Sequence, residues 1–423
     1  MEVATGSSSL ALNGGPAIRS TPLPPRMMIG TGEAQAAATL MDRLLREGGS
    51  FDRYDGPEVD LLEADLARYF GVQYVTCVSS GTAAVHAALG ALDLDPGTEV
   101  IVSSFTDPGA IMPLFFMGLI PVFVDHDVTS TLMAPQSIAA AVTTRTGAIL
   151  VTHLHGFVCD MDPIMEIGKA HGVPVIGDAS QAHAAQYHGS IAAPFGDIGV
   201  VSTMAWKHMT TGGQGGFIAT NREDLYWAAK RFADRGKPFN QQATSNTGLG
   251  LNYRMTELAA VIGRVQLGKL LGVATRRRAL LADLTRALEQ TRTVRVVQPS
   301  PDTIPTPYTI PFRVDVERLG ESNKFLAEAM SAEGFPMVPG NRAALVYNLD
   351  FVVHEKSFGH TFYPFNTPVL GHQTNWSRPH NPGVDELARR LVVIHPHEDW
   401  TALEVSELVA SVLKIEGVLM SGR

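Results

Sequence analysis

Short apolar runs and amphipathic helical segments alternate along the first half of this chain, and this alternation limits the possible folds more than any other feature of the sequence. The apolar runs include YVTCV (74–78), EVIVSS (99–104) and VPVIGD (173–178). Their lack of polar alternation is typical of strands that are covered on both faces. We therefore predict an α/β fold with a mostly parallel sheet covered by helices, with ligands at the carboxyl ends of the strands.

The sequence also predicts three segments. Residues 1–25 are rich in Gly and Pro, which resist regular structure, so we expect an N-terminal arm that lies over the surface. Residues 26–265 are expected to form a large domain around the sheet, and residues 266–423 a smaller C-terminal α+β domain. A long helical stretch from about Thr256 to Gln290 should connect them.

Composition and charge exclude several classes of function. The 42 acidic residues outnumber the 33 basic ones, and no run of Lys and Arg is long enough to follow a nucleic-acid backbone. The N-terminus lacks a basic segment followed by an apolar one, and no stretch offers about twenty uninterrupted apolar residues. We expect a cytoplasmic enzyme with no nucleic-acid or membrane partner.

A candidate phosphate site lies between the run YVTCV and the helical segment after it. Gly81 and Thr82 stand at the start of that helix. Unpaired amides at a helix N-terminus attract anions, and small residues let a phosphate approach closely. An ordinary helix N-cap would explain the same residues, so both interpretations stay open.

An acid and a lysine follow later strands. Asp178 ends the run VPVIGD, where a carboxylate needs a partner because a buried unpaired charge is costly. A protonated pyridine nitrogen would serve, and a helix cap or a metal site shared with His183 are the alternatives. Lys207 precedes the glycine-rich stretch TTGGQGG (210–216). Partial burial there would lower the pKa of its amine enough to attack an aldehyde, although a solvated surface lysine is also possible. Ser202, shortly before it, could reach the same phosphate.

The order of these features favours one chemistry. A phosphate turn, then an acid on a strand end, then a lysine is what a pyridoxal 5′-phosphate (PLP) enzyme of fold type I requires. From about Leu12 to Lys414 the chain resembles the DegT/StrS family of PLP-dependent sugar aminotransferases. The matching segments are GPEVDLLEADLARYFG, VSSGTAAVHAAL, IPVFVD, VTHLHG, CDMDPIMEIGKAHGVPVIGDASQAHAA, SxxxxKxxTTG, LNYRMTELAAVIGRVQL and ELARRLVVIHPH.

The resemblance implies a function and a role for each matching residue. The enzyme would move an amino group from glutamate or glutamine onto a keto-sugar or a ketocyclitol, and the opening LALNGGPAIR is similar to members that aminate ketocyclitols. Lys207 would form the Schiff base with PLP, Asp178 would bind the pyridine nitrogen, and Gln181 would contact the ring oxygen. The phosphate would be held by Gly81, Thr82 and Ser202, with Asn252 reaching the phosphate of the neighbouring subunit in a homodimer with shared active sites.

Two departures from the family pattern leave rival functions open. Family members usually place a ring-stacking aromatic where this chain has Asp107, and their TTGEGG loop is replaced here by a longer one that contains Gln214. Both positions are candidates for contact with substrate. A PLP-dependent sugar dehydratase, epimerase or cyclase is therefore the alternative, and a non-catalytic PLP or sugar-binding regulator is less favoured because Lys207, Asp178 and Gln181 are all present.

Several histidines are further candidates for the substrate pocket. His153 and His155 follow the end of a strand, His183 follows Asp178, and His208 follows Lys207. A structural histidine is the alternative for each of them. Their spacing does not support a zinc site, so no metal is expected.

Overall fold

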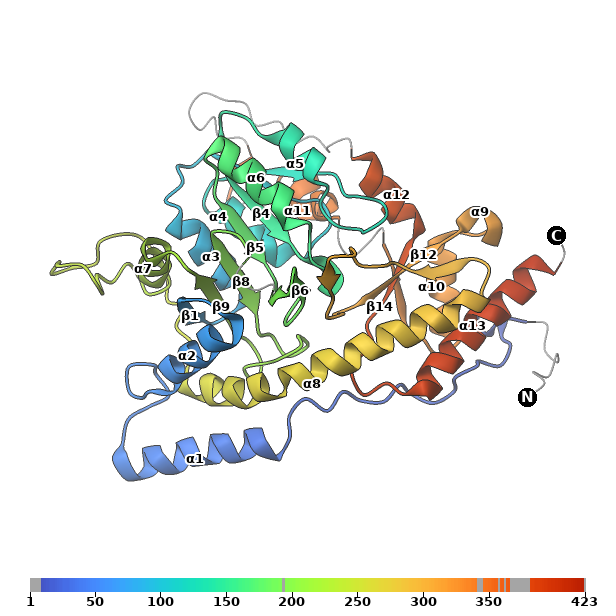
Figure 1. Ribbon diagram of the computed structural model, residues 1–423, viewed down its shortest axis with the longest axis horizontal. Coiled ribbons are helices and arrows are strands. Elements are labelled where there is room, and N and C mark those ends of the chain that lie inside the picture. Colours follow the sequence, from blue (N-terminus) through green and yellow to red (C-terminus); the bar gives the residue numbers. More distant parts are fainter. Residues whose placement is uncertain are drawn as a thin grey trace.

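A seven-stranded sheet forms the centre of the protein (Figure 1). The computed structural model describes residues 9–191, 195–340, 345–356, 358–360, 363–365 and 381–421. Among the described strands of this sheet, β9 alone runs against the others, which confirms the mostly parallel sheet predicted from the sequence. The strands, in spatial order, are β1 (Tyr74–Val78), β9 (Gly216–Thr220), β8 (Ile198–Ser202), β5 (Val175–Asp178), β4 (Thr146–Thr152), β2 (Glu99–Ser103) and β3 (Ile120–Val124).

Both faces of the sheet are buried, which explains the continuous apolar runs in the sequence. Along β2, Val100 and Val102 enter one core and Ile101 enters the other, as the alternation of side chains across a strand requires. The helices that contribute to the core of Val100 include α3 (Gly81–Ala91), α4 (Met112–Phe116) and α7 (Glu223–Phe232). Those that contribute to the other core include α2 (Glu58–Phe70), α5 (Pro135–Ala141), α6 (Met161–His171) and α8 (Glu257–Ala287).

Helix α8 connects the two halves of the molecule and crosses Figure 1 as a long diagonal rod. With the turn η4 (Leu288–Gln290) it matches the helical stretch predicted from Thr256 to Gln290, and the Thr256 hydroxyl caps it by accepting from Ala259 N. By length and composition Glu257–Gln290 could span a membrane. However, it carries the buried Arg277 and packs against α1 (Thr31–Glu47), α2 and α13 (Ala402–Met420). It is therefore a core helix of this fold, and the cytoplasmic location stays a prediction.

A second, antiparallel sheet builds the C-terminal region. Its order is β10 (Val294–Val296), β12 (Ile310–Val314), β14 (Leu391–Ile394) and β13 (Met337–Pro339). Helices α10 (Asn323–Ala332) and α13 contribute to its core. The remaining α-helices described here are α9 (Val316–Leu319), α11 (Asp350–Val353) and α12 (Pro382–Arg390). A small third sheet joins β11 (Thr303–Ile304), β6 (Gln186–Tyr187) and β7 (Ser190–Ile191).

The N-terminal arm is packed into the protein more firmly than the sequence suggested. Its described part contains the turn η1 (Ala11–Asn13), and both Leu10 and Arg19 are buried. The carboxylate of Glu333 accepts hydrogen bonds from the main-chain amides of Ala11 and Ile18. The arm is therefore tied to the C-terminal region. Helix α8 runs unbroken through the boundary expected at 265/266, so the proposed domain limits stay a prediction.

Candidate functional site

Residues at the carboxyl ends of the parallel strands line one pocket of about 180 Å³. This is the edge of an open α/β sheet where ligands bind. The residues singled out from the sequence that line it are Gly81, Thr82, Asp107, Asp178, Gln181, Ser202, Lys207 and Gln214. The structure thus brings the expected phosphate turn, acid and lysine to one place.

The first turn of α3 forms one wall of this pocket. Ser80 is the N-cap, and its hydroxyl accepts from Ala83 N at 3.0 Å. The amides of Gly81 and Thr82, in the first turn, have no partners within the helix. A Cβ at residue 81 would lie 2.5 Å from the Cβ of Ser202, so only glycine fits between the helix and β8. The cap and the anion site considered from the sequence are therefore compatible, because different residues form them.

Asp178 is a buried acid at the end of β5. The residue is only 6% exposed, and its Oδ1 accepts a hydrogen bond from Ser180 N at 2.9 Å. Burial raises the pKa of this carboxyl, although its bonds to Ser180 and the charge of Lys207 oppose that shift. The described residues place no salt bridge on Asp178. A cationic group bound in the pocket would therefore stabilise its ionised form.

Lys207 lies on the loop between β8 and β9 and is 7% exposed. Burial lowers the pKa of its amine, while the negative charges of Asp178 and Asp107 act in the opposite direction. Its Nζ lies 4.2 Å from the centroid of the Tyr308 ring. Burial thus favours the neutral, nucleophilic form of this amine, which lies against the face of the Tyr308 ring.

The other polar lining residues are oriented by local hydrogen bonds. Gln181 Oε1 accepts from the main-chain amide of His155 at 3.0 Å, which leaves the Gln181 NH2 group to donate to a ligand. Asp107 caps the turn η2 (Pro108–Ala110) by accepting from Gly109 N at 2.8 Å. The main-chain carbonyl of Gln214 accepts from Thr211 Oγ1 at 3.0 Å. Gln181 is therefore held with its NH2 group available to donate a hydrogen bond.

The four histidines do not line this pocket. His153, His155, His183 and His208 are all buried, and burial lowers the pKa of His153 to about 4 and of His155 and His183 to about 3. They are neutral side chains that support the surrounding main chain. His153 Nδ1 accepts from Cys159 N (3.2 Å), His155 Nδ1 lies 2.7 Å from Thr309 Oγ1, and the Nε2 atoms of His183 and His208 donate to the carbonyls of Ser202 and Thr306 (2.9 Å each). No group of three His, Cys, Asp or Glu in the described ranges could hold a metal ion.

Asn252 also lies outside the pocket of its own chain. It is exposed and pairs with Asp234 in an isolated antiparallel bridge. A role for Asn252 in a neighbouring subunit therefore stays a prediction.

Two other residues around the site, Ser180 and Tyr308, were not identified from the sequence. Ser180 links two parts of the pocket, because its amide donates to Asp178 and its hydroxyl accepts from Ser202 N at 2.9 Å. Tyr308 comes from the C-terminal region, just before β12, and no local pattern in the sequence connects it with Lys207. Ser180 could have been found from its place beside Asp178, whereas Tyr308 could not.

Comparisons with known proteins agree on one family. The DegT/DnrJ/EryC1/StrS aminotransferase family profile matches residues 35–338. The chain is 37% identical over 212 residues to the GDP-perosamine synthase of Escherichia coli O157:H7, which is 50% of this chain and 58% of that protein. The match thus spans little more than half the length of that relative.

Solved structures share the fold over nearly the whole chain. The aminotransferase from Psychrobacter cryohalolentis superposes with a TM-score of 0.81 at 28% identity, covering 94% of this chain and 100% of that one. The GDP-4-keto-6-deoxy-D-mannose-3-dehydratase of E. coli with bound hydrated PLP has a TM-score of 0.77 at 23% identity, covering 92% and 98%. The latter likeness shows the fold alone.

Proposed function

Because this chain belongs to the DegT/DnrJ/EryC1/StrS aminotransferase family, we propose that it is a PLP-dependent aminotransferase that moves an amino group from an amino acid onto a keto-sugar or a ketocyclitol. The observation that carries this proposal is the convergence of Lys207, Asp178 and the N-terminus of α3 on one pocket. A lysine, an acid and an anion site are the three protein groups that PLP chemistry needs.

The residues of the pocket fit PLP. The close approach of Gly81 to Ser202 leaves the helix amides as a cradle for a phosphate, with Thr82 beside them. Asp178, buried and without a salt bridge among the described residues, would bind the protonated pyridine nitrogen. The NH2 group of Gln181 would donate to the ring oxygen, because its Oε1 is already occupied by His155 N.

Lys207 and Asp178 would share the chemical work. When bound, PLP supplies an electron sink for the electron pair left at the donor α-carbon. Burial holds Lys207 Nζ closer to its neutral form, so Nζ would take the proton from that carbon and deliver it as a general acid to the C4′ carbon of PLP, and would move a proton in the opposite direction when the acceptor is aminated. Asp178 carries the negative charge that keeps the ring nitrogen protonated.

The amino acceptor is proposed from the family and from its relatives. GDP-perosamine synthase is named for a GDP-linked product, which supports a keto-sugar as the acceptor class, and the N-terminal resemblance keeps a free ketocyclitol as the second candidate. For the donor we propose glutamate or glutamine. The exposed Asn252 is consistent with a homodimer in which this residue reaches the phosphate site of the other subunit.

The test is a half-reaction with purified PLP-loaded protein. Addition of glutamate or glutamine alone should convert the bound cofactor to pyridoxamine 5′-phosphate, seen as loss of its visible absorbance and release of the keto acid. A panel of keto-sugars and ketocyclitols should then restore the absorbance, and the best of them identifies the acceptor.

The same experiment separates the rival functions. A dehydratase, epimerase or cyclase, for which Asp107 in place of the usual aromatic is the supporting observation, would transform a sugar without releasing an aminated product. A regulator would bind PLP or sugar and release no keto acid. Either result would reject transamination.

A further inference from the structure

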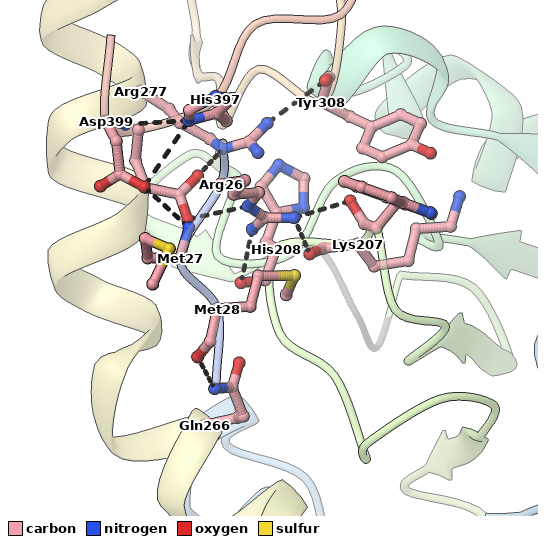
Figure 2. A network of polar contacts seen from close by, with 12 residues as sticks. Arg26, Met27, Met28, Lys207, His208, Gln266, Arg277, Tyr308, His397 and Asp399 are labelled. Carbon is pink, nitrogen blue, oxygen red and sulfur yellow. Dashed lines mark hydrogen bonds and ion pairs between the residues drawn. The ribbon is translucent and has the colours of Figure 1, made fainter. Parts of the chain in front are cut away.

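Three charged side chains from distant parts of the sequence form a buried chain beside Lys207 (Figure 2). Arg26 Nε donates to one oxygen of Glu398 and Arg277 Nε donates to the other, each at 2.9 Å. The three side chains are between 2% and 6% exposed. They come from the segment before α1, from α8 and from the loop after β14. Buried charges persist only where partners compensate for lost hydration, and Glu398 compensates both arginines here. We call Arg26, Arg277 and Glu398 the clamp.

Arg26 holds the main chain of the catalytic loop. Its Nη1 donates to the carbonyls of Trp206 and Lys207, each at 2.9 Å, and its Nη2 reaches the carbonyl of His208 at 3.5 Å. These carbonyls lie between β8 and β9, outside the ladders of the sheet. A planar guanidinium with several donors can bind such adjacent acceptors at once, which an ammonium group cannot do in the same geometry.

Arg277 holds the residue that faces the lysine amine. Its Nη1 donates to the carbonyls of Pro307 at 2.8 Å and Tyr308 at 3.2 Å, and the Tyr308 ring is the one that lies 4.2 Å from Lys207 Nζ. Figure 2 shows Arg277 above Arg26, with Tyr308 and Lys207 to one side. Glu398 therefore connects the backbone that carries Lys207 with the backbone that carries Tyr308.

The segment around Arg26 is fixed by further contacts that leave its guanidinium little freedom. His397 Nε2 donates to the Pro24 carbonyl at 2.8 Å, and Gln266 Nε2 donates to the Met28 carbonyl at 2.8 Å. The Met27 amide donates to Asp399 at 3.3 Å. The main chain is thus held on both sides of Arg26. The Arg26 side chain extends from this fixed segment to the loop of Lys207.

We propose that Arg26 is a positioning residue which, through Glu398 and Arg277, holds Lys207 Nζ in register with the Tyr308 ring. The proposal rests on the function proposed above, in that Lys207 is the reacting amine. An amine near an aromatic face is sensitive to its position, since the ring attracts the ammonium form within about 6 Å. A shift of about 1 Å at a reacting group can cost on the order of 100-fold in rate. The clamp prevents such a shift.

The arm offers a matched control for this role. Arg19 is a buried arginine close to Arg26 in the sequence, and it binds Glu404, Glu407 and the Pro22 carbonyl. None of these residues lines the Lys207 pocket. Arg19→Gln therefore tests the general loss of a buried arginine from this part of the chain, and Arg26→Gln tests the contact with the catalytic loop.

The first measurement uses cofactor-free protein. Acylation of Lys207 by acetic anhydride is followed across pH by peptide mass spectrometry. Because burial lowers the pKa of Lys207, release of its loop in Arg26→Gln should move the midpoint of acylation to higher pH, whereas Arg19→Gln should keep the wild-type midpoint. An unchanged midpoint in Arg26→Gln, or an equal shift in Arg19→Gln, would overturn the proposal.

The second measurement uses the loaded enzyme. Arg26→Gln should lower kcat by about 10- to 100-fold with little change in the KM of the amino donor, and Arg26→Lys, which keeps the charge without the planar fork, should recover only part of the loss. If Arg26→Gln does not fold, Arg26→Lys and Glu398→Gln carry the same acylation comparison. Failure of wild-type protein to react with any amino donor would reject the aminotransferase function alone, because acylation requires no turnover.

Discussion

The pocket around Lys207 has two sides that are held in different ways. On the sheet side, Asp178 and Ser202 are the last residues of β5 and β8, and Gly81 begins the helix that follows β1. Main-chain amides two positions further along the chain donate to the side chains of Asp178 and Ser202, at 2.9 Å and 3.3 Å. On the other side, the clamp joins three segments that are each more than 100 residues apart in the sequence. The charged side chains that join them are almost fully buried.

This difference separates chemistry from positioning. Asp178 and Ser202 are placed by backbone that remains intact when the side chain is changed, so their substitution should alter reactivity and leave the fold in place. The clamp residues depend on one another, because removal of one charge leaves its partners buried without compensation. Substitutions on the sheet side should therefore lower activity more than stability. Substitutions in the clamp should lower the free energy of unfolding.

The largest expected effect is at Lys207, which lines the pocket together with the sheet-side residues and whose main chain is held by Arg26. Lys207→Ala should remove the visible absorbance of bound PLP and lower turnover by about 1,000-fold or more, since general acid–base catalysis alone contributes roughly 10²–10⁴-fold. The cofactor-free variant should unfold at the same temperature as wild type or higher, because a buried amine has been removed. Retained absorbance or turnover would contradict the assignment of Lys207. A large loss of stability would show that Lys207 holds the fold together as well as reacting.

The next largest effect is on the clamp. Glu398→Ala leaves Arg26 and Arg277 buried and uncompensated, so the free energy of unfolding should fall by about 3–5 kcal/mol. Ser202→Ala removes a hydroxyl that accepts from Met204 N at 3.3 Å and should cost about 1 kcal/mol. Urea denaturation of cofactor-free proteins compares the two. Equal losses would show that the two sides are not held differently.

The same contrast explains which residues of the site could be identified from the sequence. The family resemblance and the mostly parallel sheet were predicted and are confirmed, because each apolar run and the polar residues that follow it lie next to one another in the chain. The lining residues Lys207, Asp178 and Gly81 were found in this way. Arg26 and Glu398 were not, because a single charged residue in a loop has no periodicity and its partners are set only by tertiary packing.

Two other features were beyond the sequence for related reasons. Strand β9 follows directly on the glycine-rich loop, and the loop signal obscured a short strand that runs against its neighbours. The four histidines follow strands or known site residues, as pocket residues do. The direction of a side chain at an irregular position is set by packing, and the ring of His153 instead packs against Phe195 in a T-shaped contact.

The smallest effect concerns two acids with opposite pKa shifts. Burial alone would raise the pKa of Glu398, but Arg277 and Arg26 more than offset it and lower that pKa below its ordinary value of 4.5. Its stabilising contribution is therefore complete above about pH 4.5 and is lost as the pH falls through its lower folded-state pKa. Asp178 has a pKa raised by burial above its ordinary value of 3.8, so its ionisation destabilises the cofactor-free fold above that range, and this cost disappears as the pH falls.

Unfolding free energies of wild type, Glu398→Gln and Asp178→Asn, measured in urea between pH 3 and pH 7, separate the two contributions. The advantage of wild type over Glu398→Gln should shrink on acidification, because the pKa of Glu398 is lowered in the folded protein. The difference between wild type and Asp178→Asn should change in the opposite direction, in favour of wild type. Parallel pH dependences in the two variants would mean that the clamp acid and the sheet acid have similar environments, and would remove the electrostatic basis for treating the two sides of the pocket as distinct.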